Sequence, residues 1–320
     1  MALSLTDSKR TRRRPTLADF LPLPAGEGRG EGECAHPTPA LSNTTPLIRR
    51  CRPLLGTFVE ITAHGFSEKK ILRAVEAAFA AIARVQTLMS VHDATSEVSL
   101  LNREAATQPV RVSRDTFTVM QRGLALAAES GGAFDFTVAS VLARWGLRDR
   151  RLRVPRAGDW CDVELLPRQR VRFARPLALD LGGIATGFAV DLASAKRQAA
   201  GLPAATVNAG GDLRTFGPRA ATVHLRDPRA PQRFAHQIEI ENCAVATSSP
   251  CFTERRWRGR LVSHLVDPQN ARPTTGAISV TVRAPECWLA DALTKVVLHA
   301  PPLAEKILAR HEAEAFVFRA

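Results

Sequence analysis

The sequence predicts an α+β protein built from mixed sheets with flanking helices. Segments with helical periodicity are interleaved irregularly with short segments rich in β-branched residues. No segment recurs at a fixed period along the 320 residues. A doubly wound parallel sheet would instead show strands and helices in regular alternation. The apolar share of 45% is sufficient for a proper hydrophobic core.

The N-terminal 46 residues are expected to lie outside this fold. A basic cluster, Lys9 to Arg14, is followed only by a short apolar patch that prolines interrupt, so we identify no secretory signal. The stretch that follows, up to residue 46, is rich in Gly, Pro and Glu without periodicity, which is typical of disorder. We therefore expect a disordered leader, or residues added by an upstream start codon, at 1–46 and one folded domain at 47–320.

The first half of the folded part predicts a strand and two long helices. "TFVEITAH" alternates, which predicts a strand at 57–63. A helix of about 20 residues is expected to follow Ser67 as N-cap. Its buried face is predicted to consist of Ile71, Val75, Ala78, Phe79, Ile82 and Val85. "VHDATSEVSLLN" is interpreted as a turn-rich segment, and a second helix is expected from Ser113 to about Ser130, where two glycines end it.

The second half predicts two glycine turns and a series of short strands. "LDLGGIATG" predicts a strand, a tight turn and a helix, and "VNAGGDLRTFG" predicts a hairpin. Further strands are expected at "ATVHLRD", "FAHQIEIENCAVATSS", "LVSHLVDP", "AISVTVRAP" and "EAFVFRA". "ECWLADALTKVVLHA" and "PLAEKILARHEA" predict helices.

Net charge and cysteine content indicate which partners and which compartment the protein is suited to. The net charge of +13 suits a polyanion, an anionic membrane surface or a phosphate-bearing ligand, but it also follows from a general excess of arginine. Without a recognisable nucleic-acid module, we expect no nucleic-acid partner. The six cysteines lack zinc-ligand spacing and indicate free thiols. No apolar run reaches the length of a membrane span. We expect a cytoplasmic protein, with a periplasmic or membrane-associated location as the alternative.

Four segments carry residues suited to chemistry, and each also has a structural interpretation. The turn after Asp180 either binds an anion at a helix N-terminus or uses the acid to satisfy its own backbone donors. The Gly-Gly turn after Asn208 is a hairpin signal or a second cleft wall. His264 is a packed or surface histidine, or part of a site at a strand end. Asp291, on an apolar helix, either pairs with Lys295 or holds a hard cation such as Mg2+.

The order of these segments resembles the ApbE family of FAD:protein FMN transferases. The matching motifs are "LLGTFVEI", "LMSVHDATSEVSLLN", "GGAFDFTVASVLARWG", "LDLGGIATGFAVD", "VNAGGDLRTFG", "AVATSS", "HLVDPQNARP" and "ADALTKVVL". They cover about residue 50 to 320. The resemblance implies that 47–320 is a single catalytic domain with a flavin cleft and bound Mg2+. It implies a transferase that cleaves FAD, attaches FMN by a phosphoester to a Thr or Ser of an acceptor protein, such as a membrane redox subunit, and releases AMP.

The same resemblance assigns roles to individual residues. It implies FAD contacts at Leu55, Ala133, Phe134, Asp135, Asp180, Thr186, Asn208, Gly211, His264 and Leu265. It implies metal contacts at the main-chain carbonyl of Gly183 and at Asp291 and Thr294. Catalytic roles fall to His264, as an aid to deprotonating the acceptor hydroxyl, and to Asp291.

The chain departs from the family pattern at three positions. Thr186 occupies a position where the family usually has lysine. Lys295 occupies the position of the usual threonine ligand, and the nearest threonine, Thr294, precedes it by one residue. "ATSSPCF" lacks the usual aromatic flavin contact, for which Phe252 is a candidate substitute. A lysine ammonium does not ligate Mg2+ but could fill the cation's place. Two alternatives therefore stay open: a flavin-binding protein without transfer activity, and an FAD pyrophosphatase that gives FMN and AMP.

Overall fold

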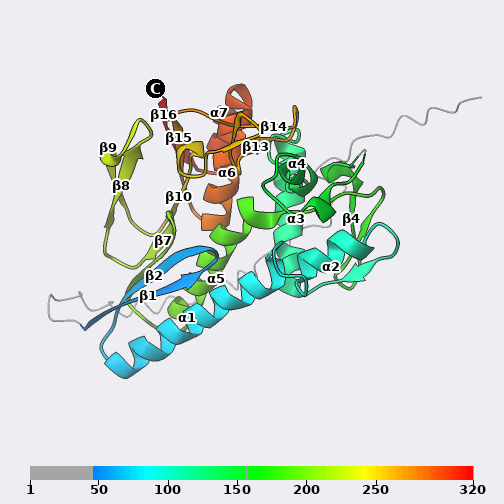
Figure 1. Ribbon diagram of the computed structural model, residues 1–320. Coiled ribbons are helices and arrows are strands. Elements are labelled where there is room, and N and C mark those ends of the chain that lie inside the picture. The colour runs from blue at the N-terminus through cyan, green and yellow to red at the C-terminus, as the bar shows by residue number, and fades with distance from the viewer. Residues whose placement is uncertain (1–45, 156, 320) are drawn as a thin grey trace, which may run out of the picture.

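The computed structural model describes residues 46–155 and 157–319 and is built around one antiparallel sheet (Figure 1). Seven strands form this sheet in the order β1-β2-β6-β7-β10-β15-β16. They are β1 (Leu47–Leu54), β2 (Thr57–His64), β6 (Ala204–Ala209), β7 (Asp212–Phe216), β10 (Ala244–Ser248), β15 (Ile278–Ala284) and β16 (Glu314–Arg319). The predicted α+β class is confirmed. The predicted leader, apart from Pro46, lies outside the described residues.

Three helices pack side by side along the sheet. They are α1 (Glu68–Met89), α5 (Ala185–Ala199) and α6 (Cys287–His299). Helix α5 packs between α1 and α6 and also contacts β6 and β7, while α6 lies against β10 and β15. The six residues predicted as the buried face of α1 are all buried. The last helix, α7 (Pro301–Arg310), follows α6 and precedes β16, as the sequence predicts.

A second group of elements lies between α1 and α5 in the chain and beside them in space (Figure 1). It contains α2 (Glu97–Glu104), α3 (Arg114–Glu129), α4 (Ala139–Arg144) and a three-stranded sheet of β3 (Val110–Arg111), β5 (Arg170–Phe173) and β4 (Val163–Leu166). The prediction of turns throughout "VHDATSEVSLLN" is wrong beyond Ser96, where α2 begins. Ser96 caps this helix by accepting a hydrogen bond from the Ser99 N–H at 3.0 Å.

The strand predicted before Asp180 is also wrong, for a local reason. Residues 177–180 form only one isolated parallel bridge, between Val138 and Ala178. The next residue, Leu179, pairs instead with the side-chain amide of Asn102. Its N–H donates to Asn102 Oδ1 at 2.6 Å, and its carbonyl accepts from Asn102 Nδ2 at 3.1 Å. One amide side chain thus takes the place of a neighbouring strand and holds the chain extended up to the turn.

The remaining strands form three hairpins. They are β8 (Ala221–Asp227) with β9 (Ala230–Ile240), β11 (Arg255–Trp257) with β12 (Arg260–Val262), and β13 (Val266–Asp267) with β14 (Arg272–Pro273). The single strand predicted for "LVSHLVDP" is therefore divided between β12 and β13. His264 lies in the irregular backbone between them. Among the described residues, no helix is both long enough and apolar enough to cross a membrane.

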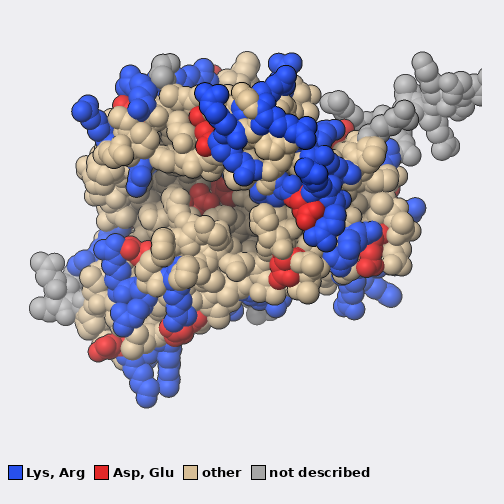
Figure 2. All heavy atoms as spheres, in the orientation of Figure 1, with Lys and Arg blue, Asp and Glu red and all other residues tan. Residues whose placement is uncertain are grey.

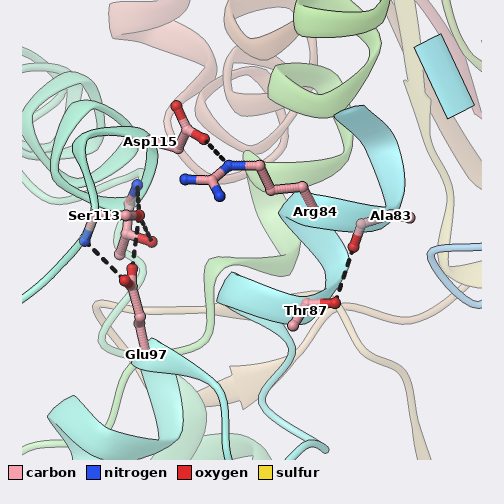
Figure 3. A network of polar contacts seen from close by, with 7 residues as sticks. Ala83, Arg84, Thr87, Glu97, Ser113 and Asp115 are labelled. Atoms are coloured by element: carbon pink, nitrogen blue, oxygen red, sulfur yellow. Dashed lines mark hydrogen bonds and ion pairs between the residues drawn. The ribbon is translucent and has the colours of Figure 1, made fainter. Parts of the chain in front are cut away.

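Polar contacts fasten α1, α2 and α3 to one another (Figure 3). Arg84 of α1 pairs with Asp115 of α3 at 2.8 Å. Glu97 of α2 accepts hydrogen bonds from both the N–H and the hydroxyl of Ser113, each at 2.8 Å. The Ser113 hydroxyl in turn accepts from the Thr116 N–H at 3.3 Å. Ser113, where the sequence predicts the start of this helix, is thus the N-cap of α3, and it also links α3 to α2.

Replacing Ser113 by alanine is expected to lower the free energy of unfolding by about 1–2 kcal/mol, because it removes this cap. Ser67→Ala is the matched control, since Ser67 holds the N-cap position of α1 but its side chain makes no capping hydrogen bond. Urea unfolding followed by circular dichroism measures both variants. Equal effects at the two serines would show that the Ser113 hydrogen bonds do not stabilise α3.

Candidate functional site

The two glycine turns predicted from the sequence open onto one cleft. It has a volume of about 390 Å³ and includes Gly182 and Gly183 on one side and Gly210 on the other. The hollow in the middle of the face in Figure 2 has acidic side chains inside it and many Lys and Arg side chains above and to its right. The prediction that the turns form two walls of a cleft is consistent with this placement.

The Asp180 turn is held by its own carboxylate and by an arginine. Asp180 is 6% exposed and its N–H donates to the carbonyl of Phe136 at 2.8 Å. One carboxylate oxygen accepts from the Gly182 N–H at 2.9 Å, and the other accepts from Arg148 Nε at 2.7 Å. Asp180 therefore satisfies a backbone donor of its own turn, which is the structural role that the sequence allowed for this acid. It also anchors the Arg148 guanidinium at the cleft wall.

Gly187 allows α5 and α6 to approach closely enough to form the floor of the cleft. A Cβ at Gly187 would lie 2.3 Å from the carbonyl oxygen of Cys287, so no other residue fits there without displacing α6. The Gly187 N–H points to the Asp291 carboxylate, with 3.4 Å between N and Oδ2. This contact brings the Asp180 turn, at the start of α5, against the polar side chains of α6.

Asp291 pairs with Lys295, one turn later on α6. The Lys295 ammonium contacts the Asp291 carboxylate directly and also lies 2.9 Å from the Asp291 carbonyl oxygen. Both side chains are largely buried, at 6% and 15% exposure, and both line the cleft. The aliphatic part of Lys295 lies beside Gly183, since a Cβ there would be 3.3 Å from Lys295 Cε.

Thr294 lies behind the lining of the cleft, bonded to Ser248, which does line it. Its hydroxyl donates to the Asp291 carbonyl at 2.6 Å and shares a 2.7 Å hydrogen bond with the hydroxyl of Ser248. The side chain is fully buried and does not line the cleft. Its predicted role as a metal ligand therefore has no support from its position.

The residues expected to hold Mg2+ do not form a divalent-cation site in this structure. Hard cations need several oxygen ligands that are not already committed. The Asp291 carboxylate is paired with an ammonium group, and the Thr294 hydroxyl is bonded elsewhere. Within residues 46–155 and 157–319, no group of three or more His, Cys, Asp or Glu side chains is arranged to bind a metal. The donor set thus suits an ammonium rather than Mg2+.

Two histidines in the cleft wall have lowered pKa values. The His264 side chain is exposed, but partial desolvation at the cleft wall lowers its pKa below the ordinary value, and the charges of Arg148 and Arg255 lower it further, against the opposite effect of Asp180. Burial likewise lowers the pKa of His299. The His299 ring lies 3.1 Å from the Thr274 hydroxyl and 3.4 Å from the Ala133 carbonyl oxygen. Both imidazoles are therefore neutral at pH 7.

Two acids in the cleft have raised pKa values. Burial raises the pKa of Asp135 to about 6, although hydrogen bonds from the Thr137 N–H and hydroxyl oppose the rise. Burial raises the pKa of Asp212 well above its ordinary value; the Asp291 charge adds to the rise and Lys295 opposes it. Acidic residues with shifted pKa values are found preferentially at functional sites. The two raised pKa values therefore support a functional site at this cleft.

Most of the predicted site residues come together here. Those that line the cleft are Leu55, Ala133, Phe134, Asp135, Asp180, Gly183, Thr186, His264, Leu265 and Asp291. Asn208 and Gly211 line a neighbouring groove of about 610 Å³, where the Gly211 N–H donates to Asn208 Oδ1 at 2.9 Å. Phe252, proposed as the substitute aromatic, lines both cavities.

Sequence reasoning missed two basic residues of the cleft, Arg148 and His299. It noted Asp212 as the acid of the second Gly-Gly turn but gave it no role in the site. Arg148 is one of many arginines in a charged segment, and His299 ends an apolar helix. Nothing in their local sequence distinguishes these two from surface residues.

Comparison with known proteins identifies the fold and the family. Residues 55–317 match the sequence model of the ApbE family. The FAD:protein FMN transferase of Treponema pallidum is 27% identical over 277 residues, covering 76% of each chain. The protein of the same name from Vibrio cholerae is 30% identical over 226 residues, covering 65% of this chain and 68% of that one. A crystal structure of the ApbE protein from Thermotoga maritima has a TM-score of 0.75 at 28% identity, covering 85% of this chain and 94% of that chain. The chain belongs to the ApbE family.

Proposed function

We propose that this protein is an FAD:protein FMN transferase, which moves FMN from FAD onto a Ser or Thr hydroxyl of an acceptor protein and releases AMP. The names of the matching relatives support this activity. The observation that carries the proposal is the cleft, which gathers the Asp180 turn, His264 and the Asp291–Lys295 pair around one space. Its volume of about 390 Å³ is within the range of small-molecule sites.

The proposed reaction exchanges one phosphorus–oxygen bond for another. The acceptor hydroxyl oxygen bonds to the phosphorus of the FMN half of FAD. The bond from that phosphorus to the bridging oxygen breaks, and AMP leaves with that oxygen. The hydroxyl proton passes to a base, and no oxidant or reductant is required. Such transfers depend mainly on positioning and on neutralising phosphate charge.

The chain's own residues are suited to both tasks. The glycines at 182, 183 and 210 leave the backbone accessible, so phosphate groups can approach it closely. Arg148, held by Asp180, presents a fixed positive charge at the cleft wall. Phe252, an exposed aromatic residue that lines the cleft, offers an apolar surface for a ring system. The residues expected to hold Mg2+ do not fit that ion, and no step proposed here passes through a metal.

His264 is the proposed base for the acceptor hydroxyl. Because its pKa lies below the ordinary 6.5, the imidazole is neutral at pH 7 and can accept a proton. The rate of transfer is expected to be constant above pH 6.5 and to fall as the pH decreases through the lowered pKa. His264→Gln should reduce the rate by about 10²–10⁴-fold and remove this acid limb. Initial rates of AMP release from pH 5 to 8 measure both effects; a variant with the wild-type profile would exclude His264 as the base.

The activity is tested by incubating the purified chain with FAD and an acceptor protein that carries a Ser/Thr flavinylation site. Chromatography measures AMP, and in-gel fluorescence measures flavin on the acceptor. The proposal predicts both products, and no labelling when the acceptor residue is replaced by alanine. AMP with free FMN and an unlabelled acceptor would indicate a pyrophosphatase instead. FAD that binds but stays intact would indicate a flavin-binding protein.

The acceptor class and the cell compartment extend this proposal. We favour a subunit of a membrane redox complex as acceptor, because the family resemblance suggests it. We favour the cytoplasm because Cys51, Cys243, Cys251 and Cys287 are free thiols. Cell fractionation with immunoblotting tests the compartment, and recovery in a periplasmic fraction would contradict it.

A further inference from the structure

We propose that the ammonium group of Lys295 is the resident cation of the cleft, occupying the place that the family resemblance assigns to Mg2+ and binding the pyrophosphate of FAD. This inference rests on the proposed function and deepens it. It makes the chain's transfer reaction independent of a divalent metal at Asp291. Geometry, burial and charge each support it.

Lys295 lies between the two residues to which the resemblance assigns the metal. Its aliphatic chain passes beside Gly183, and its ammonium contacts Asp291. The ammonium contacts the Asp291 carboxylate and lies 2.9 Å from the Asp291 carbonyl oxygen. An ion bound to the same carboxylate would have to displace this charged group, whose side chain is only 15% exposed.

The ammonium retains the capacity to bind a phosphate. A lysine ammonium has three N–H donors and no acceptor. Two of them are directed to the oxygens of Asp291, so one donor is left for the cleft that Lys295 lines. Lysine binds phosphate well as a compact point charge. The pair thus holds the cation in place and leaves it able to contact a ligand oxygen.

The cleft needs a positive charge at this position. The Asp291 carboxylate is paired with Lys295, and a pyrophosphate would bring further negative charge. Thr186, where the family pattern has lysine, is a neutral residue of the same cleft. Arg148, the other strongly basic residue lining it, is paired with Asp180 at 2.7 Å. Lys295 therefore supplies the positive charge on the α6 side of the cleft.

Metal binding tests the inference without reference to activity. Mn2+ is titrated into the full chain without FAD and followed by electron paramagnetic resonance. Wild-type protein is expected to bind no Mn2+ at micromolar concentrations. Lys295→Thr, which removes the ammonium and offers a hydroxyl one turn from Asp291, is expected to bind it. Lys306→Thr makes the same substitution at an exposed position of α7 and should behave as wild type. Tight Mn2+ binding by wild-type protein that Asp291→Ala abolishes would overturn the inference.

The second test measures the rate of AMP release, once in excess EDTA and once in excess Mg2+. Wild-type protein and Lys306→Thr should release AMP at equal rates in both. Lys295→Thr should be about 100-fold slower in EDTA, the usual cost of losing one charged stabilising group, and Mg2+ should restore part of the loss. A wild-type rate that collapses in EDTA and returns with Mg2+ would contradict the inference, and this measurement needs no variant to fold. If no protein releases AMP, the proposed function fails, while the Mn2+ titration still decides the role of Lys295.

Discussion

Asp191→Ala is expected to lower the free energy of unfolding by about 3–5 kcal/mol, because it removes a buried carboxylate that binds two helix donors and an arginine. Asp191 of α5 is 8% exposed and accepts hydrogen bonds from the Cys287 and Trp288 N–H groups, each at 2.9 Å. It also pairs with Arg214 at 2.5 Å. Glu286, the N-cap residue of α6, makes no capping hydrogen bond with its side chain. Asp191 thus caps α6 from a neighbouring helix, and its loss leaves two helix donors and a guanidinium unpaired.

Urea unfolding of Asp191→Ala and of a matched control measures this effect. The control is Asp115→Ala, which breaks the exposed pair of Asp115 with Arg84. Exposed pairs contribute at most about 1 kcal/mol, so the control should be nearly neutral. Similar losses in the two variants would mean that Asp191 does not fix the start of α6.

Gly187→Ala is expected to lower the rate of transfer about 100-fold, because a displacement of about 1 Å at a reacting centre has this effect. The added Cβ would lie 2.3 Å from the Cys287 carbonyl oxygen and 2.7 Å from the Trp288 Cα. These are backbone atoms, so α6 has to move as a whole, and Asp291 and Lys295 move with it. The overpacking should also lower the free energy of unfolding by about 1–3 kcal/mol.

The matched control for Gly187→Ala is Ala195→Ser, which adds one heavy atom to an exposed position of the same helix. It should retain the wild-type rate and stability. AMP release is measured at a temperature where circular dichroism finds each variant folded, so that loss of activity reports displacement of α6. A folded Gly187→Ala protein with the wild-type rate would contradict the account of how the cleft floor is positioned.

The parts of the fold that the sequence predicted correctly depend on short-range patterns. The buried face of α1, the hairpin at the Gly-Gly turn and the start of α3 near Ser113 each follow from residues close together in the chain. The errors arise where contacts between residues distant in the sequence determine the local structure. The Asn102 amide replaces a strand partner for Leu179, 77 residues away in sequence. No local pattern contains that contact.

In the candidate site, too, residues in local motifs were predicted and residues defined by distant contacts were not. Its glycine turns, His264 and Asp291 were found from local motifs and their order, and the structure places them around one cleft. Arg148 was not found, because its partner Asp180 lies 32 residues further along the chain. The Asp291–Lys295 pair was foreseen as one of two alternatives, since both residues lie on one face of a helix. The choice between pair and metal depended on tertiary contacts, which place Gly183 beside Lys295 and bond the Thr294 hydroxyl to Ser248.

The ratio of AMP released to flavin covalently bound is the most direct measurement of the central claim, that this cleft transfers FMN from FAD to a protein hydroxyl. Purified chain, FAD and acceptor protein are incubated, AMP is quantified by chromatography, and acceptor-bound flavin is quantified by absorbance after denaturation. The account predicts one AMP for each flavin attached, with both products reduced together in Gly187→Ala. AMP formed in large excess over bound flavin, or no AMP while FAD is bound, would contradict it.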